Sequence, residues 1–177
     1  MASNVDSHSL PDKSGTIRLG IPSKYRPSVR NGVAAATALG VPSAFSLGLD
    51  AAAVAAVWAA MLKSMSTASS RELDSVYVAK LVGTVLAGCG SYLVAIRIGT
   101  ALFNVIPGAG TTASIAINSG LNAILTFRLG STFATMLEQP DFELTDMAKI
   151  TKTFLRAFIS IPTAGERGDF SNIIQGI

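Results

Sequence analysis

The chain has little of what catalytic and metal sites are built from. Its 177 residues include one histidine, His8, and one cysteine, Cys89. A single cysteine forms no disulfide within the chain, and the apolar helical pattern around Cys89 is typical of an inert buried thiol. His8 lies in a polar segment, which argues against a His/Cys metal site or a Cys-His nucleophile. With no cluster of acid, base and nucleophile, the sequence predicts a protein that is not an enzyme and needs neither metal nor cofactor.

Charge is also scarce. Charged residues make up 14% of the chain and hydrophobic residues 49%, whereas average soluble chains carry about 25% charged residues. A surface with so few charges is either small or partly in lipid. The net charge of +3 and the 7% of aromatic residues are too low to indicate nucleic-acid binding.

Residues 1–27 lack helical periodicity and lack the apolar core of a signal peptide. We expect a flexible polar N-terminal segment. Basic residues collect toward its end and just beyond it, at Lys24, Arg26 and Arg30.

What the sequence does contain is apolar helix interrupted by turn signals. The stretch 102–130 combines a helix end, a Pro-Gly-x-Gly turn and a second apolar helix. Pro107 ends the first helix because it lacks a backbone N–H, and Gly108 and Gly110 tolerate positive φ. Thr111 or Thr112 is then the expected cap of the next helix. The turn has no lysine after its final glycine and follows a helix, so it is not interpreted as a phosphate-binding loop.

The helix after this turn is apolar almost all round, which indicates burial or a membrane span. Asn118 and Asn122 lie four residues apart on one face of it. Small residues along both arms of the turn favour close helix packing, so we expect Gly88 and Gly120 to face neighbouring helices.

Two arginines interrupt these apolar helices. Folding the chain about Gly108 places Arg97 near Asn118 and Asn122. We expect the Arg97 guanidinium to bond to these amides, to a carbonyl or to an acid. The alternative is that the side chain of Arg97 extends along the helix to reach water. The same folding places Arg128 near Gly88. For Arg128, nearer the open end, extension to water is the favoured expectation.

An earlier hairpin is predicted over residues 28–66. Ser28 is the expected cap of its first helix and Pro42 its stop. Asp50 precedes an alanine run, which favours a role as cap of the second helix, the alternative being an intramembrane acid with a functional role. A helix needs about 20 apolar residues to span a bilayer, and both helices are short for this. Hairpin one is therefore expected to be re-entrant, interfacial or buried against hairpin two.

The predicted fold is all-α, with two antiparallel helical hairpins plus a C-terminal amphipathic helix. The single helical domain covers residues 28–160. Its parts are hairpin one (28–66), a linker (67–75), hairpin two (76–139), whose helices are long enough to span, and an amphipathic helix (140–160), followed by a tail (161–177).

The C-terminal helix is predicted to have Thr145 as its cap and Pro162 as its stop. Its basic residues Lys149, Lys152 and Arg156 lie on a different face from its apolar ones. Two interpretations remain open: the apolar face docks on the bundle, or the helix lies on an anionic membrane surface.

The pattern from Val29 to Leu137 resembles a bacterial domain found in YcjF-like proteins and beside Era-like GTPases. The sharpest part of the resemblance is IPGAG followed by AINSGLNA; EcsC-like proteins show a similar two-hairpin pattern as the second choice. The resemblance implies a bacterial, membrane-associated helical module that works with a GTPase. This chain has no GTPase motif of its own, so such a partner would act in trans.

Two functions therefore follow as expectations. The first is a self-assembling, homo-oligomeric protein of the bacterial cytoplasmic (inner) membrane that binds lipid and acts with a soluble partner. The second is a soluble, cytoplasmic all-α scaffold with its apolar faces buried in a homo-oligomer. Basic residues gather in the N-terminal segment, the linker and the C-terminal helix, while the two turns carry none. In the membrane case, these three regions and both termini are predicted to be cytoplasmic.

Overall fold

The computed structural model describes residues 20–43, 49–88, 110–161 and 163–176, and these residues form helices and loops without a strand. The predicted all-α class is confirmed. The elements are η1 (Ser23–Tyr25), α1 (Arg26–Ser43), α2 (Leu49–Ala68), a helix over Ser75–Gly88, α4 (Gly110–Glu138), α5 (Met147–Ile159) and α6 (Ala164–Gln175).

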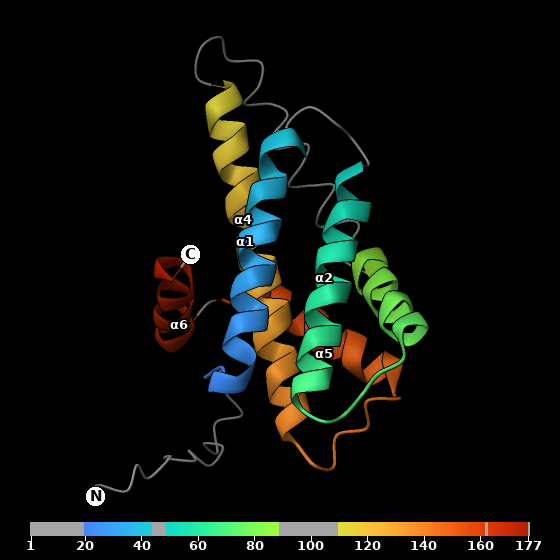
Figure 1. Cartoon of the computed structure of the whole chain (residues 1–177). Coiled ribbons are helices and arrows are strands. Elements are labelled where there is room, and N and C mark those ends of the chain that lie inside the picture. The colour runs from blue at the N-terminus through green and yellow to red at the C-terminus, as the bar shows by residue number, and fades with distance from the viewer. Residues whose placement is uncertain (1–19, 44–48, 89–109, 162, 177) are drawn as a thin grey trace, which may run out of the picture.

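Most of the helices stand side by side (Figure 1). α1 packs against α2 and α4, and its direction is opposite to both. The helix Ser75–Gly88 stands beyond α2, and α5 crosses the upright helices. α6 lies against the other side of α1.

The core is centred on the second half of α4. Nearly every residue from Ala123 to Leu137 is buried, because α1, α2, α5 and η1 supply apolar side chains around it. The one tryptophan, Trp58 of α2, lies in this core, and its indole N–H donates to Thr126 Oγ1 at 2.8 Å. The apolar character all round α4 therefore reflects burial within the chain over this half.

Backbones approach closely where α1, α2 and α4 meet. A Cβ atom added at Gly130 would lie 2.8 Å from Cγ2 of Val29, and one at Gly32 would lie 2.6 Å from Sδ of Met61. Such distances are shorter than real Cβ contacts, so glycine permits this packing.

Several segments distant in sequence meet at one end of the bundle. The Tyr25 hydroxyl donates to Oε1 of Glu138 at 2.7 Å, which joins the start of α1 to the end of α4. The Arg71 guanidinium donates to the carbonyls of Gln139 and Phe142 at 3.0 and 2.6 Å. The segment before α1, the α2 connection and the α4–α5 connection thus share one end.

The N-terminal boundaries of the helices differ from those predicted. η1 and the buried Tyr25 lie within the segment expected to be a flexible tail. α1 begins at Arg26, so Ser28 is inside the helix and its Oγ lies 2.8 Å from that of Ser64 on α2. Pro27, the second helical residue, needs no hydrogen-bond partner for its nitrogen, which favours the earlier start.

Similar shifts occur at other helix ends. α1 ends at Ser43, one residue beyond Pro42. Asp146, not Thr145, caps α5, and its Oδ1 accepts a hydrogen bond from the backbone N–H of Lys149 at 2.9 Å. Residues 139–146, expected in part to be helical, form the connection before α5.

The predicted C-terminal tail contains α6. Thr163 caps it, and its Oγ1 accepts from the backbone N–H of Glu166 at 3.1 Å. The ring of Phe170 packs edge-on against Phe127 of α4, with centroids 5.2 Å apart. α6 is therefore part of the folded domain.

Candidate functional site

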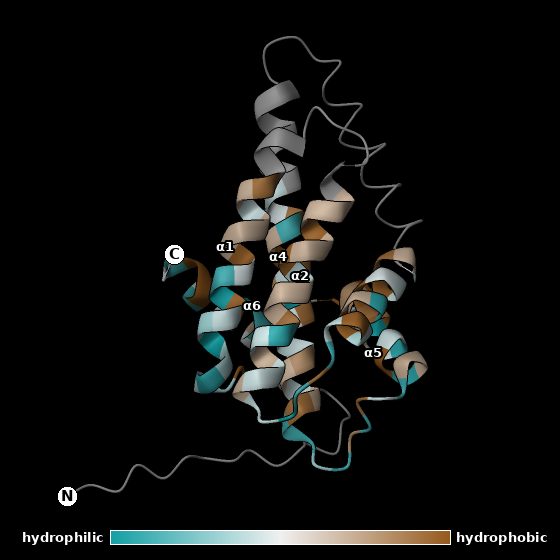
Figure 2. Cartoon of the chain, turned by 45° about the vertical axis from the view of Figure 1, so that its right-hand side comes forward, coloured by the Kyte–Doolittle hydropathy of each residue, from teal (hydrophilic) through white to brown (hydrophobic). Residues whose placement is uncertain are grey.

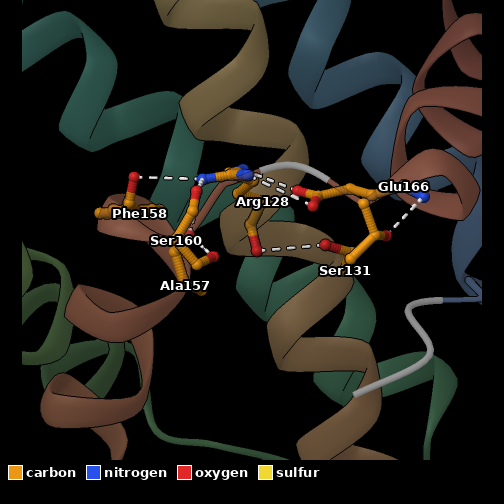
Figure 3. Close-up of polar contacts among 7 residues, drawn as sticks. Arg128, Ser131, Ala157, Phe158, Ser160 and Glu166 are labelled. Carbon is orange, nitrogen blue, oxygen red and sulfur yellow. Dashed lines mark hydrogen bonds and ion pairs between the residues drawn. The ribbon is translucent and has the colours of Figure 1, made fainter. Parts of the chain in front are cut away.

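Arg128 is the buried charge around which the C-terminal half of the chain is arranged. Its side chain is 4% exposed and lies on the buried half of α4. Its Nε and Nη2 donate to the two carboxylate oxygens of Glu166 at 2.6 and 3.2 Å. Its Nη1 donates to three carbonyls at the end of α5, those of Ala157, Phe158 and Ser160, at 2.8, 3.1 and 2.7 Å (Figure 3).

This geometry fixes structure and does not offer a binding site. A bidentate contact is the strongest arrangement for an arginine and a carboxylate, and Glu166 is itself only 6% exposed. With Nε, Nη1 and Nη2 all engaged, the guanidinium has little capacity left for a ligand. The ion pair joins α4 to α6, and the hydrogen bonds of Nη1 join α4 to the end of α5.

The expectation that Arg128 extends to water is therefore wrong. The predicted hairpin brings only its own two arms together, whereas the partners of Arg128 lie 29 to 38 residues further along the chain. Gly88 has a different neighbour: a Cβ there would lie 3.2 Å from Cδ1 of Leu155 on α5.

Other predicted residues lie at helix starts. α2 begins at Leu49, so Asp50 lies in its first turn and is not its cap. α4 begins at Gly110, so Thr111 and Thr112 are likewise inside the first turn, which corrects their expected role as cap.

The predicted amide face is described only in part. Asn118 and Asn122 are both in α4, and Asn122 is half-buried. Gly120 is exposed, and no atom of the described residues lies within 4 Å of a Cβ placed there. Arg97, Pro107 and Gly108 lie outside the described residues, so the pairing of Arg97 with the amides stays a prediction.

Among the residues that the structure describes, the end of the upright helices opposite the charged connections is almost free of charge. Between Arg30 and Lys63 the only charged residue is Asp50. Figure 2 shows hydrophilic residues mainly at the other end of these helices. The exposed residues of α1, α2 and α4 toward this uncharged end are mostly small, namely Ala35, Ala38, Ala51, Ala52, Ala56, Ala60, Ala116, Gly120 and Ile124.

One described helix has the length and composition to cross a membrane. The window Ala51–Ala68 of α2 meets both criteria, and 33% of it is buried inside the chain. Sequence reasoning had instead placed the long spans in hairpin two, where α4 carries buried Arg128 and many small polar residues. A core helix of a soluble protein passes the same test, so this finding fits either setting.

α5 has two distinct faces. Ile150, Phe154 and Phe158 are buried against the bundle. The ring centroids of Phe158 and Trp58 are 5.9 Å apart, and those of Phe154 and Phe133 are 6.4 Å apart. These contacts confirm the interpretation that the apolar face of α5 docks on the bundle. The three basic residues are exposed on the other side, at Lys149, Lys152 and Arg156.

Sequence reasoning missed Glu166 and the helix that carries it. The signal was present as Thr163-x-x-Glu166, the pattern of a helix start. Only the threonine half of that pattern is used, because the Glu166 carboxylate turns to Arg128.

Within the described ranges, no three His, Cys, Asp or Glu side chains are grouped so that they could hold a metal ion. Comparison with known proteins identifies no matching family model, no matching curated protein and no matching solved structure.

Proposed function

We propose that this chain is a non-enzymatic, membrane-associated helical protein whose uncharged end enters the bilayer. The observation that supports this most is the separation of charge along the upright helices. Asp50 is the only charge in the 32 positions between Arg30 and Lys63. A charge at the centre of a membrane helix costs about 2.5–3.5 kcal/mol on insertion scales, so an inserting end must lack charge.

The shared end of the three connections supports one topology. The contacts of Tyr25 with Glu138 and of Arg71 with Gln139 hold the segment before α1, the α2 connection and the α4–α5 connection together. A bilayer would then contain the opposite end, and the basic connections and both termini would be cytoplasmic in a bacterial inner membrane. Cysteines at Ser69 and Ser171, in a Cys89→Ala background, should then resist an impermeant thiol reagent in intact cells; labelling from outside would contradict this topology.

Self-assembly is the second part of the proposal. Exposed alanine and glycine residues at the uncharged end would allow a second copy to approach closely in lipid, where packing rather than apolar burial drives association. Recruitment of a GTPase in trans rests on the sequence resemblance alone. A GTPase partner would dock at the charged end, which stays in water.

A soluble, homo-oligomeric scaffold is the second candidate. It is favoured by the burial of the α5 apolar face and of much of α4 inside the chain itself. In this case, the uncharged end would be covered by other copies. Recovery of the chain in the soluble fraction of lysed cells without detergent would support the scaffold and count against insertion.

A matched pair of variants tests insertion directly. Ala56 and Ala68 are both exposed on α2, Ala56 at the uncharged end and Ala68 at the last helical residue. In a vesicle flotation assay, Ala56→Lys should lose membrane association and Ala68→Lys should keep it. Equal flotation of the two variants would contradict insertion of this end.

A further inference from the structure

The outward face of α5 is the part of the molecule whose chemistry is not explained by packing. Lys149, Lys152, Arg156 and Ile159 follow one another at intervals of three and four residues, so they share one face of the helix. All four are exposed, and this face lies opposite the buried residues of α5. We name these four residues, together with Ile161, the α5 outer face.

The charge on this face has one sign. No acidic residue occurs between Asp146 and Glu166. Within the described part of the chain, no carboxylate oxygen lies within the 4.0 Å of an ion pair from Lys152 or Arg156. The Lys149 ammonium lies over the Phe142 ring, 5.2 Å from its centroid. Among the described residues, the face therefore presents two cations without an ion-pair partner and a third that contacts a ring.

Two large, exposed apolar side chains follow these cations in the sequence. Ile159 is 73% exposed and Ile161 is 89% exposed, the two most exposed of the large hydrophobic residues that the structure describes. Their position is fixed, because Arg128 holds the carbonyls of Phe158 and Ser160 on either side of Ile159. The isoleucines therefore project from an ordered helix end whose inner side is already packed.

We propose that the α5 outer face binds the headgroups of anionic phospholipids, with Ile159 and Ile161 entering the membrane interface. Basic residues near an anionic membrane attract its surface, and stable attachment needs this together with apolar insertion. α5 crosses the upright helices (Figure 1), so it would lie along the membrane when their uncharged ends enter the bilayer. The inference rests on the proposed function and adds the lipid class and the residues that select it.

Partitioning into two kinds of vesicle tests this inference. The full chain is titrated with phosphatidylcholine vesicles and with vesicles that contain about a third phosphatidylglycerol. The ratio of the two partition constants isolates headgroup charge, because insertion of the uncharged end contributes to both. Each Lys or Arg near an anionic surface is worth about fivefold, so Lys152→Gln with Arg156→Gln should lower the ratio on the order of twentyfold.

A second double variant controls for total charge. Arg30 and Arg167 are exposed on α1 and α6, on the other side of the bundle from α5 in Figure 1. Arg30→Gln with Arg167→Gln removes the same charge and should keep most of the ratio. Ile159→Ser with Ile161→Ser should weaken partitioning into both vesicles severalfold and leave the ratio unchanged.

The outcomes separate the two proposals. Wild-type binding to phosphatidylcholine with a ratio near one would support insertion and overturn the α5 inference. A Lys152→Gln, Arg156→Gln variant with the wild-type ratio would also overturn it and would favour an acidic protein as the occupant of this face. Binding to anionic vesicles alone, lost in that variant, would support the α5 inference and contradict insertion.

Discussion

Arg128 and Glu166 form a buried, bidentate ion pair between α4 and α6, with Nε and Oε1 2.6 Å apart. Both side chains are less than a tenth exposed. Taking two charges out of water is costly, so the pair is expected to fix the position of α6 more than it increases net stability.

A double-mutant cycle measures the coupling of this pair. Glu166→Leu leaves a buried arginine without its counter-charge and should lower the free energy of unfolding by about 3–5 kcal/mol. Arg128→Met removes the donors to three α5 carbonyls as well and should be at least as damaging. The double variant should lose less unfolding free energy than the sum of the two single losses, as measured by urea unfolding. Strict additivity of the losses would show that the two side chains are not coupled.

Two threonines of α4 provide a matched test of core polarity. Thr126 accepts the Trp58 indole hydrogen bond, whereas buried Thr132 Oγ1 has no partner among the described residues. Thr126→Val should cost about 1–3 kcal/mol because the indole N–H is left unsatisfied. Thr132→Val should be neutral or stabilising, and a large loss of stability in this variant would contradict the contacts described here.

The Thr126 variant also has a direct optical readout. Trp58 is the only tryptophan, so its emission reports the surroundings of this hydrogen bond alone. The emission should change in Thr126→Val and stay unchanged in Thr132→Val.

Asp169 of α6 gives a prediction for pH. Burial raises the pKa of its carboxyl above the ordinary value of 3.8, while Arg26 acts in the opposite direction. Because the folded chain then holds this proton more tightly than the unfolded chain, the contribution of Asp169 to stability falls as pH rises from 3.8 through the folded pKa. Asp169→Asn should remove that fall and raise the melting temperature slightly at neutral pH.

The comparison of the two chains across pH isolates this one group. Other carboxyls titrate in the same range in both proteins, so only the difference in melting temperature is informative. A difference that stays constant from acid to neutral pH would show that Asp169 titrates alike in the folded and unfolded states.

The sequence predicted the helices well where the signal was local. Hairpin two was expected to end at residue 139, and its last helix, α4, ends at Glu138, because a proline such as Pro140 marks a helix end through backbone sterics. The caps were less predictable. Asp146 and Thr145 are both common types of cap residue, and the surrounding contacts decide between neighbours.

The partner of Arg128 could not be predicted by the same reasoning. A buried arginine requires acceptors, but the sequence does not say which of the eleven acids or which carbonyls supply them. The answer depended on α6, whose short, polar, glycine-containing sequence has little apolar periodicity. Only Glu166 and Ile173 of this helix are fully buried, with Asp169 and Phe170 half-buried, so tertiary contacts rather than its own pattern hold it in place.

The α5 helix shows the opposite case. Its two faces were visible in the sequence, but the pattern of an amphipathic helix is the same whether the apolar side meets protein or lipid. The ring contacts of Phe154 with Phe133 and of Phe158 with Trp58 decided for protein.

The central claim is that the uncharged end of the upright helices lies in the bilayer, and the position of α2 tests it most directly. An environment-sensitive fluorophore is attached to a cysteine at Ala56 or at Ala68, in a Cys89→Ala background, and the chain is added to lipid vesicles. If this end lies in the bilayer, emission at position 56 should be blue-shifted and quenched by lipids that carry a quencher on their acyl chains. Emission at position 68 should be water-like. Water-like, unquenched emission at both positions would contradict the account.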